Sequence, residues 1–212
     1  MRVVGGTAKG RKLKAPKTPG TRPVMDRVKT ALFDILAQQV KGTRFLDLFA
    51  GTGSIGIEAL SRGASAATFI ELGPEALRCV RDNLAITGFT GQSEVLRTDA
   101  FKFLESARVA GRRYDIVYVA PPQYQGLAAK ALTQLDAAPL TEPGGLVVVQ
   151  VDPREGAEVR GVPLRHLRES DERRYGSTLL LFYEHGGDIT EGERDRHTEG
   201  RSEQSEQRSE EE

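Results

Sequence analysis

The sequence predicts an α/β fold built on a mostly parallel sheet of seven strands, and three features support this prediction. Residues 44–58, RFLDLFAGTGSIGIE, read as a short buried strand, a glycine turn and a helix. Four more apolar runs of strand length follow, and helical patterns separate the first five strands. Two final runs lie close together, which predicts a closing strand pair with an antiparallel last strand.

The individual elements follow from periodicity and from turn residues. The predicted strands are 45–49, Ala66–Glu71, Ser93–Arg97, Tyr114–Val119, Leu146–Val151, Leu164–Arg168 and Ser177–Tyr183, with residues 173–176 linking the last two. The predicted helices are Val24–Val40, one that starts after Gly53, Pro74–Ile86, one opened by Asp99, and Leu127–Leu135. Residues 1–15 alternate apolar and basic side chains around glycines, which predicts a small β-hairpin with a basic face.

Composition predicts one main domain with extensions at both ends. The chain has 212 residues, 38% of them hydrophobic, enough for one substantial core. We divide it into a hairpin and helix extension (1–42), a main α/β domain (43–186) and a polar tail (187–212) expected to be disordered. No membrane span or signal segment is visible, so a cytoplasmic protein is expected. Cys79 reads as a core residue, and the three dispersed histidines suggest no metal site.

Charge is distributed unevenly, although the formal net charge is zero. Residues 1–44 hold eleven basic and two acidic side chains, a net charge of +9. Residues 187–212 hold ten acidic and four basic side chains, a net charge of −6. The basic segment suits a polyanion such as RNA, and the alternative is a solvated surface without a partner.

The glycine turn is the strongest local sign of a ligand site. Gly51 and Gly53 can adopt positive φ and let a ligand approach the backbone. Together with Gly56 they also match the dinucleotide fingerprint, so an NAD site is the rival interpretation. Asp47 favours S-adenosylmethionine, because a carboxylate there attracts an ammonium group and repels a pyrophosphate. A turn without any ligand is the third possibility.

Two further acidic residues lie at or just after the carboxyl ends of the next two predicted strands. Glu71 ends the second strand, where a carboxylate accepts hydrogen bonds from ribose hydroxyls in either kind of site. Asp99 is placed to cap the next helix or to meet an adenine amino group. The fourth strand runs directly into residues 120–124, APPQY, and the two prolines stiffen the backbone beside the expected cleft.

The ordered set of motifs resembles the RsmD-like family of bacterial methyltransferases, which modify guanine N2 in 16S ribosomal RNA. The matching blocks are MRVVGGTAKGRKLKAP, TRPVMDRVKTALFDIL, LDLFAGTGSIGIEALSRGA and RRYGSTLLLFYE, between Met1 and about Glu184. The resemblance implies a class I methyltransferase core over residues 43–186 and S-adenosylmethionine as cofactor. It also implies that the partner is ribosomal RNA or the assembling small subunit. We expect the protein to act as a monomer.

The resemblance also implies which residues form each part of the site. Asp47, Phe49, Gly51 and Gly53 would line the methionine side of the cofactor, Glu71 the ribose, and Asp99 and Ala100 the adenine, with Leu72 as a further cofactor-binding residue. Lys9, Arg11, Lys12, Arg22, Asp26 and Arg27 would contact RNA. Ala120, Pro121, Pro122, Gln123 and Tyr124 occupy the catalytic motif.

The catalytic motif departs from the family pattern, which is Asp or Asn, then Pro-Pro-Tyr. In the usual form the Asp or Asn side chain and the first proline's carbonyl accept the two hydrogens of the target amine, and the aromatic ring stacks on the flipped base. Ala120 has no acceptor, and Gln123 stands in place of the aromatic. Two hypotheses follow: an active RNA methyltransferase in which Gln123 and Tyr124 compensate, or an RNA-binding module that binds the cofactor with little or no catalysis.

Overall fold

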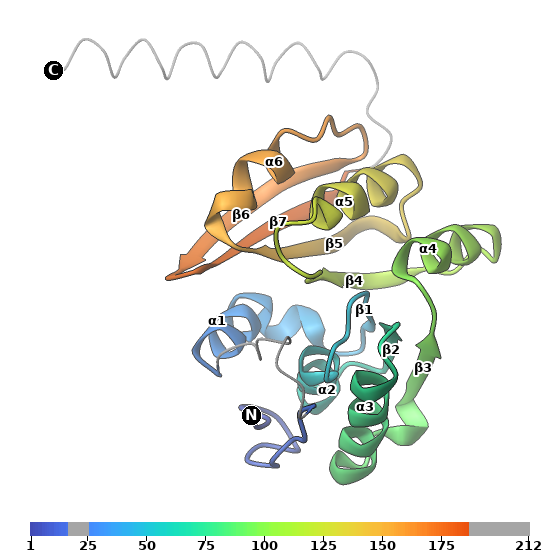
Figure 1. The fold of residues 1–212 in the computed structure, drawn as a ribbon, viewed down its shortest axis with the longest axis vertical. Helices are drawn as coiled ribbons and strands as arrows, with labels where there is room; N and C mark the ends of the chain where they lie inside the picture. The colour runs from blue at the N-terminus through green and yellow to red at the C-terminus, as the bar shows by residue number, and fades with distance from the viewer. Residues whose placement is uncertain (17–25, 187–212) are drawn as a thin grey trace, which may run out of the picture.

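A computed structural model describes residues 1–16 and 26–186. The predicted sheet of seven strands is present, with strand order β3-β2-β1-β4-β5-β7-β6 (Figure 1). Its strands are β1 (Arg44–Asp47), β2 (Ala66–Glu71), β3 (Ser93–Arg97), β4 (Tyr114–Val119), β5 (Thr141–Val151), β6 (Leu167–Tyr175) and β7 (Thr178–His185).

The sheet directions explain where a ligand can bind. Strands β1 to β5 pair in parallel, and β7 lies antiparallel between β5 and β6. The strand order reverses between β1 and β4, where the chain first builds outward to β3 and then returns. In open α/β sheets this switch point opens a crevice at the carboxyl ends of the strands. The glycine turn after β1 and the APPQY segment after β4 leave the sheet at this place.

Helices cover both faces of the sheet, as the buried hydrophobic strands require. They are α1 (Asp26–Leu36), α2 (Ser54–Ser61), α3 (Pro74–Thr87), α4 (Ala100–Val109), α5 (Leu127–Ala137) and α6 (Gly156–Arg160). Short 3₁₀ turns cover Ala37–Val40, Thr90–Gln92 and Pro153–Glu155. Helices α1, α2 and α3 pack into one apolar cluster, and α4, α5 and α6 pack into the other, on opposite faces of the sheet (Figure 1). No helix among the described residues is both long and apolar enough to cross a bilayer.

The N-terminal segment folds back on itself as predicted, but with a single bridge instead of two extended strands. Arg2 and Lys12 form an antiparallel bridge, and the Val3 amide donates to the Arg11 carbonyl at 3.0 Å. Val3 and Leu13 are buried in the same cluster as α1 and α2. The extension therefore shares its core with the main domain.

Four details of the predicted elements need correction. The sixth strand is β6, which starts at Leu167 instead of Leu164 and runs through Arg173 to Tyr175, so two residues remain for the turn. The fifth strand begins earlier, at Thr141, so residues 143–145, Pro-Gly-Gly, which favour a turn before the strand, lie inside it, where the register with β4 shifts. The short helix α6 was missed. The predicted helix 24–40 is α1 followed by a 3₁₀ turn; its first two residues, Arg22 and the tail lie outside the described residues.

Candidate active site

The glycine turn after β1 has the conformation that the motif predicts. Gly51 and Gly53 have φ of 55° and 75°, which side chains other than glycine rarely adopt. An added Cβ at Gly51 would meet no atom within 4 Å, so the backbone borders open space there. At Gly56 an added Cβ would lie 2.4 Å from the Phe69 ring, so this glycine serves close packing of α2 on β2.

Two carboxylates hold this turn. Glu71 accepts hydrogen bonds from the Gly51 amide at 2.8 Å and from the Gly73 amide at 2.7 Å, one with each oxygen. Asp47 is 2% exposed and accepts from the Gly56 amide at 3.1 Å. Burial raises the pKa of Asp47 to about 7, and the nearby Glu71 charge adds to the rise while the Gly56 hydrogen bond opposes it. A cation beside Asp47 would offset the free-energy cost of burying its carboxylate and would lower its pKa.

The remaining predicted cofactor residues surround the same strand ends. Phe49 packs edge-on against Phe101, with ring centroids 6.2 Å apart. Leu72 is 59% exposed directly after β2, as expected for a side chain that a ligand could cover. Asp99 caps α4 by accepting from the Phe101 and Lys102 amides at 3.0 and 3.1 Å, and Ala100 is buried.

These residues fit S-adenosylmethionine. Gly51 leaves room at the backbone, the half-buried Glu71 carboxylate keeps lone pairs for hydroxyl donors, and Asp47 places a buried acid near the first turn of α2. Glu71 would hold the ribose and Asp47 would attract the ammonium group. When bound, the cofactor supplies an electrophilic methyl group on a sulfonium.

The APPQY segment leaves β4 beside this cleft. Pro121 is buried, whereas Pro122, Gln123 and Tyr124 face solvent. Tyr124 has φ of 62°, a conformation that costs a non-glycine residue about 1–3 kcal/mol. Tyr124 is 58% exposed and is therefore open to a stacking partner.

A segment that sequence reasoning missed holds Tyr124. Glu155 Oε1 accepts from the Tyr124 amide at 2.8 Å, and the Arg154 guanidinium lies 5.5 Å from the centre of the Tyr124 ring. A hydrogen bond with Asp152 raises the pKa of the Tyr124 phenol, and the Arg154 amide lowers the pKa of Asp152. Asp152 followed by proline after a buried strand is a helix-start signal that would have located this segment.

The predicted RNA-contact residues gather on the N-terminal segment and α1. Lys9, Arg11, Lys12 and Arg27 are exposed, and Asp26 pairs with Arg2 at 3.0 Å. A hollow of about 320 Å³ separates the segment from α1; Arg2, Val3, Val4, Lys9, Gly10, Asp26, Arg27 and Thr30 line it. Arg22 lies outside the described residues.

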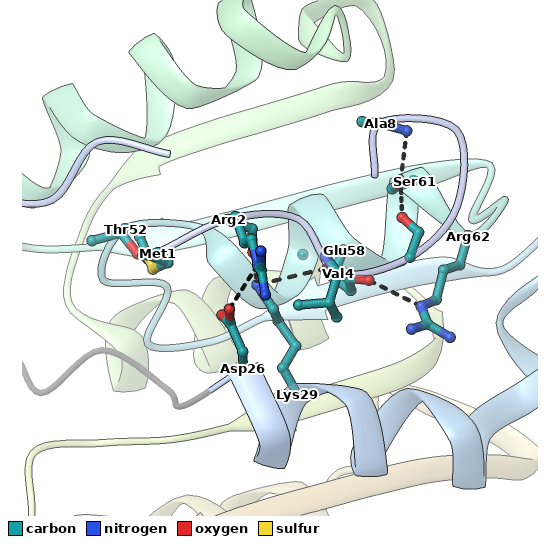
Figure 2. A network of polar contacts seen from close by, with 12 residues as sticks. Met1, Arg2, Val4, Ala8, Asp26, Lys29, Thr52, Glu58, Ser61 and Arg62 are labelled. Atoms are coloured by element: carbon teal, nitrogen blue, oxygen red, sulfur yellow. Dashed lines mark hydrogen bonds and ion pairs between the residues drawn. The ribbon is translucent and has the colours of Figure 1, made fainter. Parts of the chain in front are cut away.

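A buried polar network fixes this segment to α2 (Figure 2). Glu58 accepts from the Val4 amide at 2.8 Å and from Arg62 Nε at 3.0 Å, and the Lys29 ammonium lies 3.6 Å from Glu58. Ser61 Oγ accepts from the Ala8 amide at 2.9 Å. These contacts lie on the C-terminal half of α2, and at the glycine turn the Thr52 hydroxyl donates to Met1 Sδ at 3.5 Å, so the segment follows α2 from the turn to Ser61.

The sheet order, the glycine turn and the carboxylates at the ends of β1 and β2 define the class, the S-adenosylmethionine-dependent methyltransferases with a Rossmann-like core. The chain matches the model of a family described as Conserved hypothetical protein 95 over residues 1–184. It belongs to this family, which confirms the RsmD-like resemblance.

Individual relatives agree with this assignment. The chain is 36% identical to "Putative rRNA methyltransferase YlbH" of Bacillus subtilis, over 88% of this chain and 100% of that protein. It is 40% identical to Ribosomal RNA small subunit methyltransferase D of Escherichia coli, over 64% of this chain and 67% of that protein. The solved structure "Putative methyltransferase yhhF" from Escherichia coli matches with a TM-score of 0.75 and 32% identity, over 89% of this chain and 99% of that chain. These relatives favour the methyltransferase over the NAD enzyme and the non-catalytic module.

Proposed function

We propose that this protein transfers the methyl group of S-adenosylmethionine to N2 of a guanine in 16S ribosomal RNA. The observation that carries the proposal is the arrangement of the glycine turn beside the APPQY segment. There the Glu71 carboxylate accepts hydrogen bonds from the Gly51 and Gly73 amides. Family membership over residues 1–184 supports the same reaction. We further propose that it acts in the cytoplasm, as a monomer, on ribosomal RNA or the assembling small subunit.

The reaction needs alignment more than acid or base chemistry. The N2 lone pair forms the new bond to the methyl carbon, the electrons of the old carbon–sulfur bond stay on sulfur, and one N2 proton passes to water. We assign the Pro121 carbonyl as an acceptor for the amine and the Gln123 amide oxygen as a second. The exposed Tyr124 ring supports a stacking role, one position later than the aromatic of the family motif.

The basic N-terminal segment is assigned to RNA. Lys9, Arg11, Lys12 and Arg27 present cations to solvent, and the buried network around Glu58 holds the N-terminal segment against α1 and α2. Arg22 and Asp26 complete the set that we assign to this surface. Phosphate contacts of this kind position a nucleic acid without reading its sequence.

The deciding experiment is methyl transfer from labelled S-adenosylmethionine to small ribosomal subunits and to naked 16S RNA, followed by mapping of the labelled nucleotide. We expect one labelled guanine, with the label on N2. Label on a different base would reject the guanine assignment, and cofactor binding without any transfer would favour the binding module.

A further inference from the structure

Residues Asp152–Glu155 lie beside the catalytic motif because the sheet places them there. Strands β4 and β5 are parallel neighbours, with Val119 opposite Val149. The APPQY segment follows β4 and Asp152 follows β5, so both segments leave the same edge of the sheet. In the proposed methyltransferase this edge faces the substrate base.

Glu155 has one carboxylate oxygen that the described residues leave without a partner. The residue is 7% exposed, and Oε1 accepts from the Tyr124 amide at 2.8 Å. Oε2 is buried and has no hydrogen-bond partner among the described residues. Such a buried acceptor is costly unless a donor reaches it. Ala120, Pro121 and Pro122 cannot provide one, because their side chains hold no donor and proline has no amide hydrogen.

We propose that Glu155 is the acceptor that replaces the Asp or Asn missing at Ala120, and that it binds the edge of the target guanine that carries N1–H and the N2 amine. This inference rests on the proposed function. Guanine presents these donors side by side, and a carboxylate is an acceptor with two oxygens that can receive both. In the free protein one oxygen of Glu155 accepts from the Tyr124 amide, so the acceptor lies beside the residue that we assign to stacking.

The strained backbone of Tyr124 favours a movement that lets the base reach Glu155. Oε2 is buried, so the base reaches it only when the segment around Tyr124 moves aside. This movement breaks the hydrogen bond between the Tyr124 amide and Glu155 but relieves the φ of 62°. The exposed ring can then stack on the incoming base.

The test compares target RNA that carries guanosine at the methylated position with RNA that carries inosine, which lacks only the N2 amine. The wild type should bind the guanosine RNA about tenfold more tightly or better, as for a hydrogen bond to a charged group. The Glu155→Ala variant should keep only the part of this preference that the Pro121 carbonyl and Gln123 supply, a ratio several-fold smaller than that of the wild type, and should lose at least tenfold in kcat. Glu155→Gln keeps an oxygen for the Tyr124 amide but replaces the other with a donor, so it should lose the same part of the preference while remaining folded.

Glu158 supplies the matched control. Its exposed carboxylate lies beside the same segment, where an added Cβ at Gly126 would be 3.0 Å from Oε1. Glu158→Ala should keep the guanosine preference. An unchanged preference in both Glu155 variants, with cofactor affinity equal to that of the wild type, would overturn the inference while guanine methylation continues. If the wild type methylates no guanine, the proposed function itself fails.

Discussion

Lys29 and Glu58 form an ion pair between α1 and α2 in which both side chains are fully buried, with 3.6 Å between Nζ and Oε2. Lys29 also donates to the Arg2 carbonyl at 2.5 Å, and Glu58 holds the Val4 amide and Arg62 (Figure 2). Burial lowers the pKa of Lys29, and the Glu58 charge opposes that shift. The pair therefore joins the N-terminal segment, α1 and α2 at one point.

Substituting Glu58 should lower the free energy of unfolding more than substituting Lys29. Glu58→Gln leaves the buried Lys29 without its carboxylate, next to Arg62, which keeps only Asp34 among the described acids, and should lower the free energy of unfolding by about 3–5 kcal/mol. Lys29→Met should cost less, because Glu58 keeps Arg62 and the Val4 amide. Urea denaturation measures both. Asp82→Asn, which removes the exposed partner of Lys14, is the control and should change little. Equal losses for the two buried substitutions would contradict this account.

The buried pair also shows what a charge count misses. Lys29 contributes to the net charge of the basic segment, yet it is 0% exposed and cannot meet RNA. Lys14 is exposed but pairs with Asp82 at 2.8 Å. Sequence reasoning counts both as basic surface, because the partners come from α2 and α3 and are distant in the chain. The RNA surface is consequently smaller than the charge suggests.

The parallel strands were predictable because their apolar runs are bounded by glycine, proline and acidic residues. Ala66–Glu71, Ser93–Arg97 and Tyr114–Val119 have the predicted bounds. The extent of strand β6 was not, because its sequence LRESDERRY is almost entirely polar and only its pairing with β7 extends it to Tyr175. Edge strands of this kind lack the hydrophobic pattern on which prediction depends.

The positions of the site residues could be predicted better than their environments. Asp47 and Glu71 end β1 and β2, but nothing in the sequence indicates that Glu71 also bonds the amides of Gly51 and Gly73. The role of Glu155 depends on strand order, which brings β5 beside β4. The unpartnered Oε2 of Glu155 results from packing in the folded protein, and no sequence pattern predicts it.

Cofactor binding should release protons near neutral pH. The pKa of Asp47 is raised to about 7, so the carboxyl is about half protonated there in the free protein. An ammonium group beside it lowers the pKa, and binding at pH 7 should release about half a proton. Affinity should rise as the pH increases through 7. Calorimetry in buffers of different ionisation enthalpy measures the release, and Asp47→Asn should abolish it.

The same shift sets the pH dependence of folding for the free protein. The folded carboxyl binds its proton up to about pH 7, whereas the unfolded one loses it near 3.8. Between these values the folded state holds more protons, so this group makes stability fall as the pH rises. The unfolding free energy of Asp47→Asn should lack this decline between pH 4 and 7. An identical decline in the variant would place the titrating group elsewhere.

RNA affinity should depend on salt through the exposed cations of the N-terminal segment. Lys9→Ala combined with Arg11→Ala should flatten the slope of log affinity against log salt by about 1.4, since each contact with single-stranded phosphate contributes about 0.7. Filter binding over a salt series measures this slope. The matched control is Lys102→Ala combined with Arg108→Ala, which removes the same charges from the exposed side of α4. Equal flattening by both pairs would mean that general charge, and not this surface, binds RNA.

Restoring a side-chain acceptor in the catalytic motif should change the rate of methyl transfer. Ala120→Asn restores a side-chain oxygen at the end of β4 and should raise kcat, because a preorganised acceptor holds the amine with its lone pair toward the methyl group. Single-turnover methyl transfer measures the change, while cofactor affinity should stay level. Gln123→Ala should lower kcat, and Tyr124→Ala should weaken RNA binding by about 1–3 kcal/mol through lost stacking.

The effect of Ala120→Asn should be larger when Glu155 is absent. If Glu155 replaces the missing acceptor, the wild type already holds the amine in part, and the new oxygen adds little. In the Glu155→Ala background, Gln123 is the one side-chain acceptor that we assign to the amine, and Ala120→Asn adds a second. The ratio of kcat with Asn to kcat with Ala at position 120 should therefore be several-fold higher than in the wild-type background. Two residues that serve one function are non-additive in this way. Equal ratios in the two backgrounds would show that positions 120 and 155 act on different parts of the substrate.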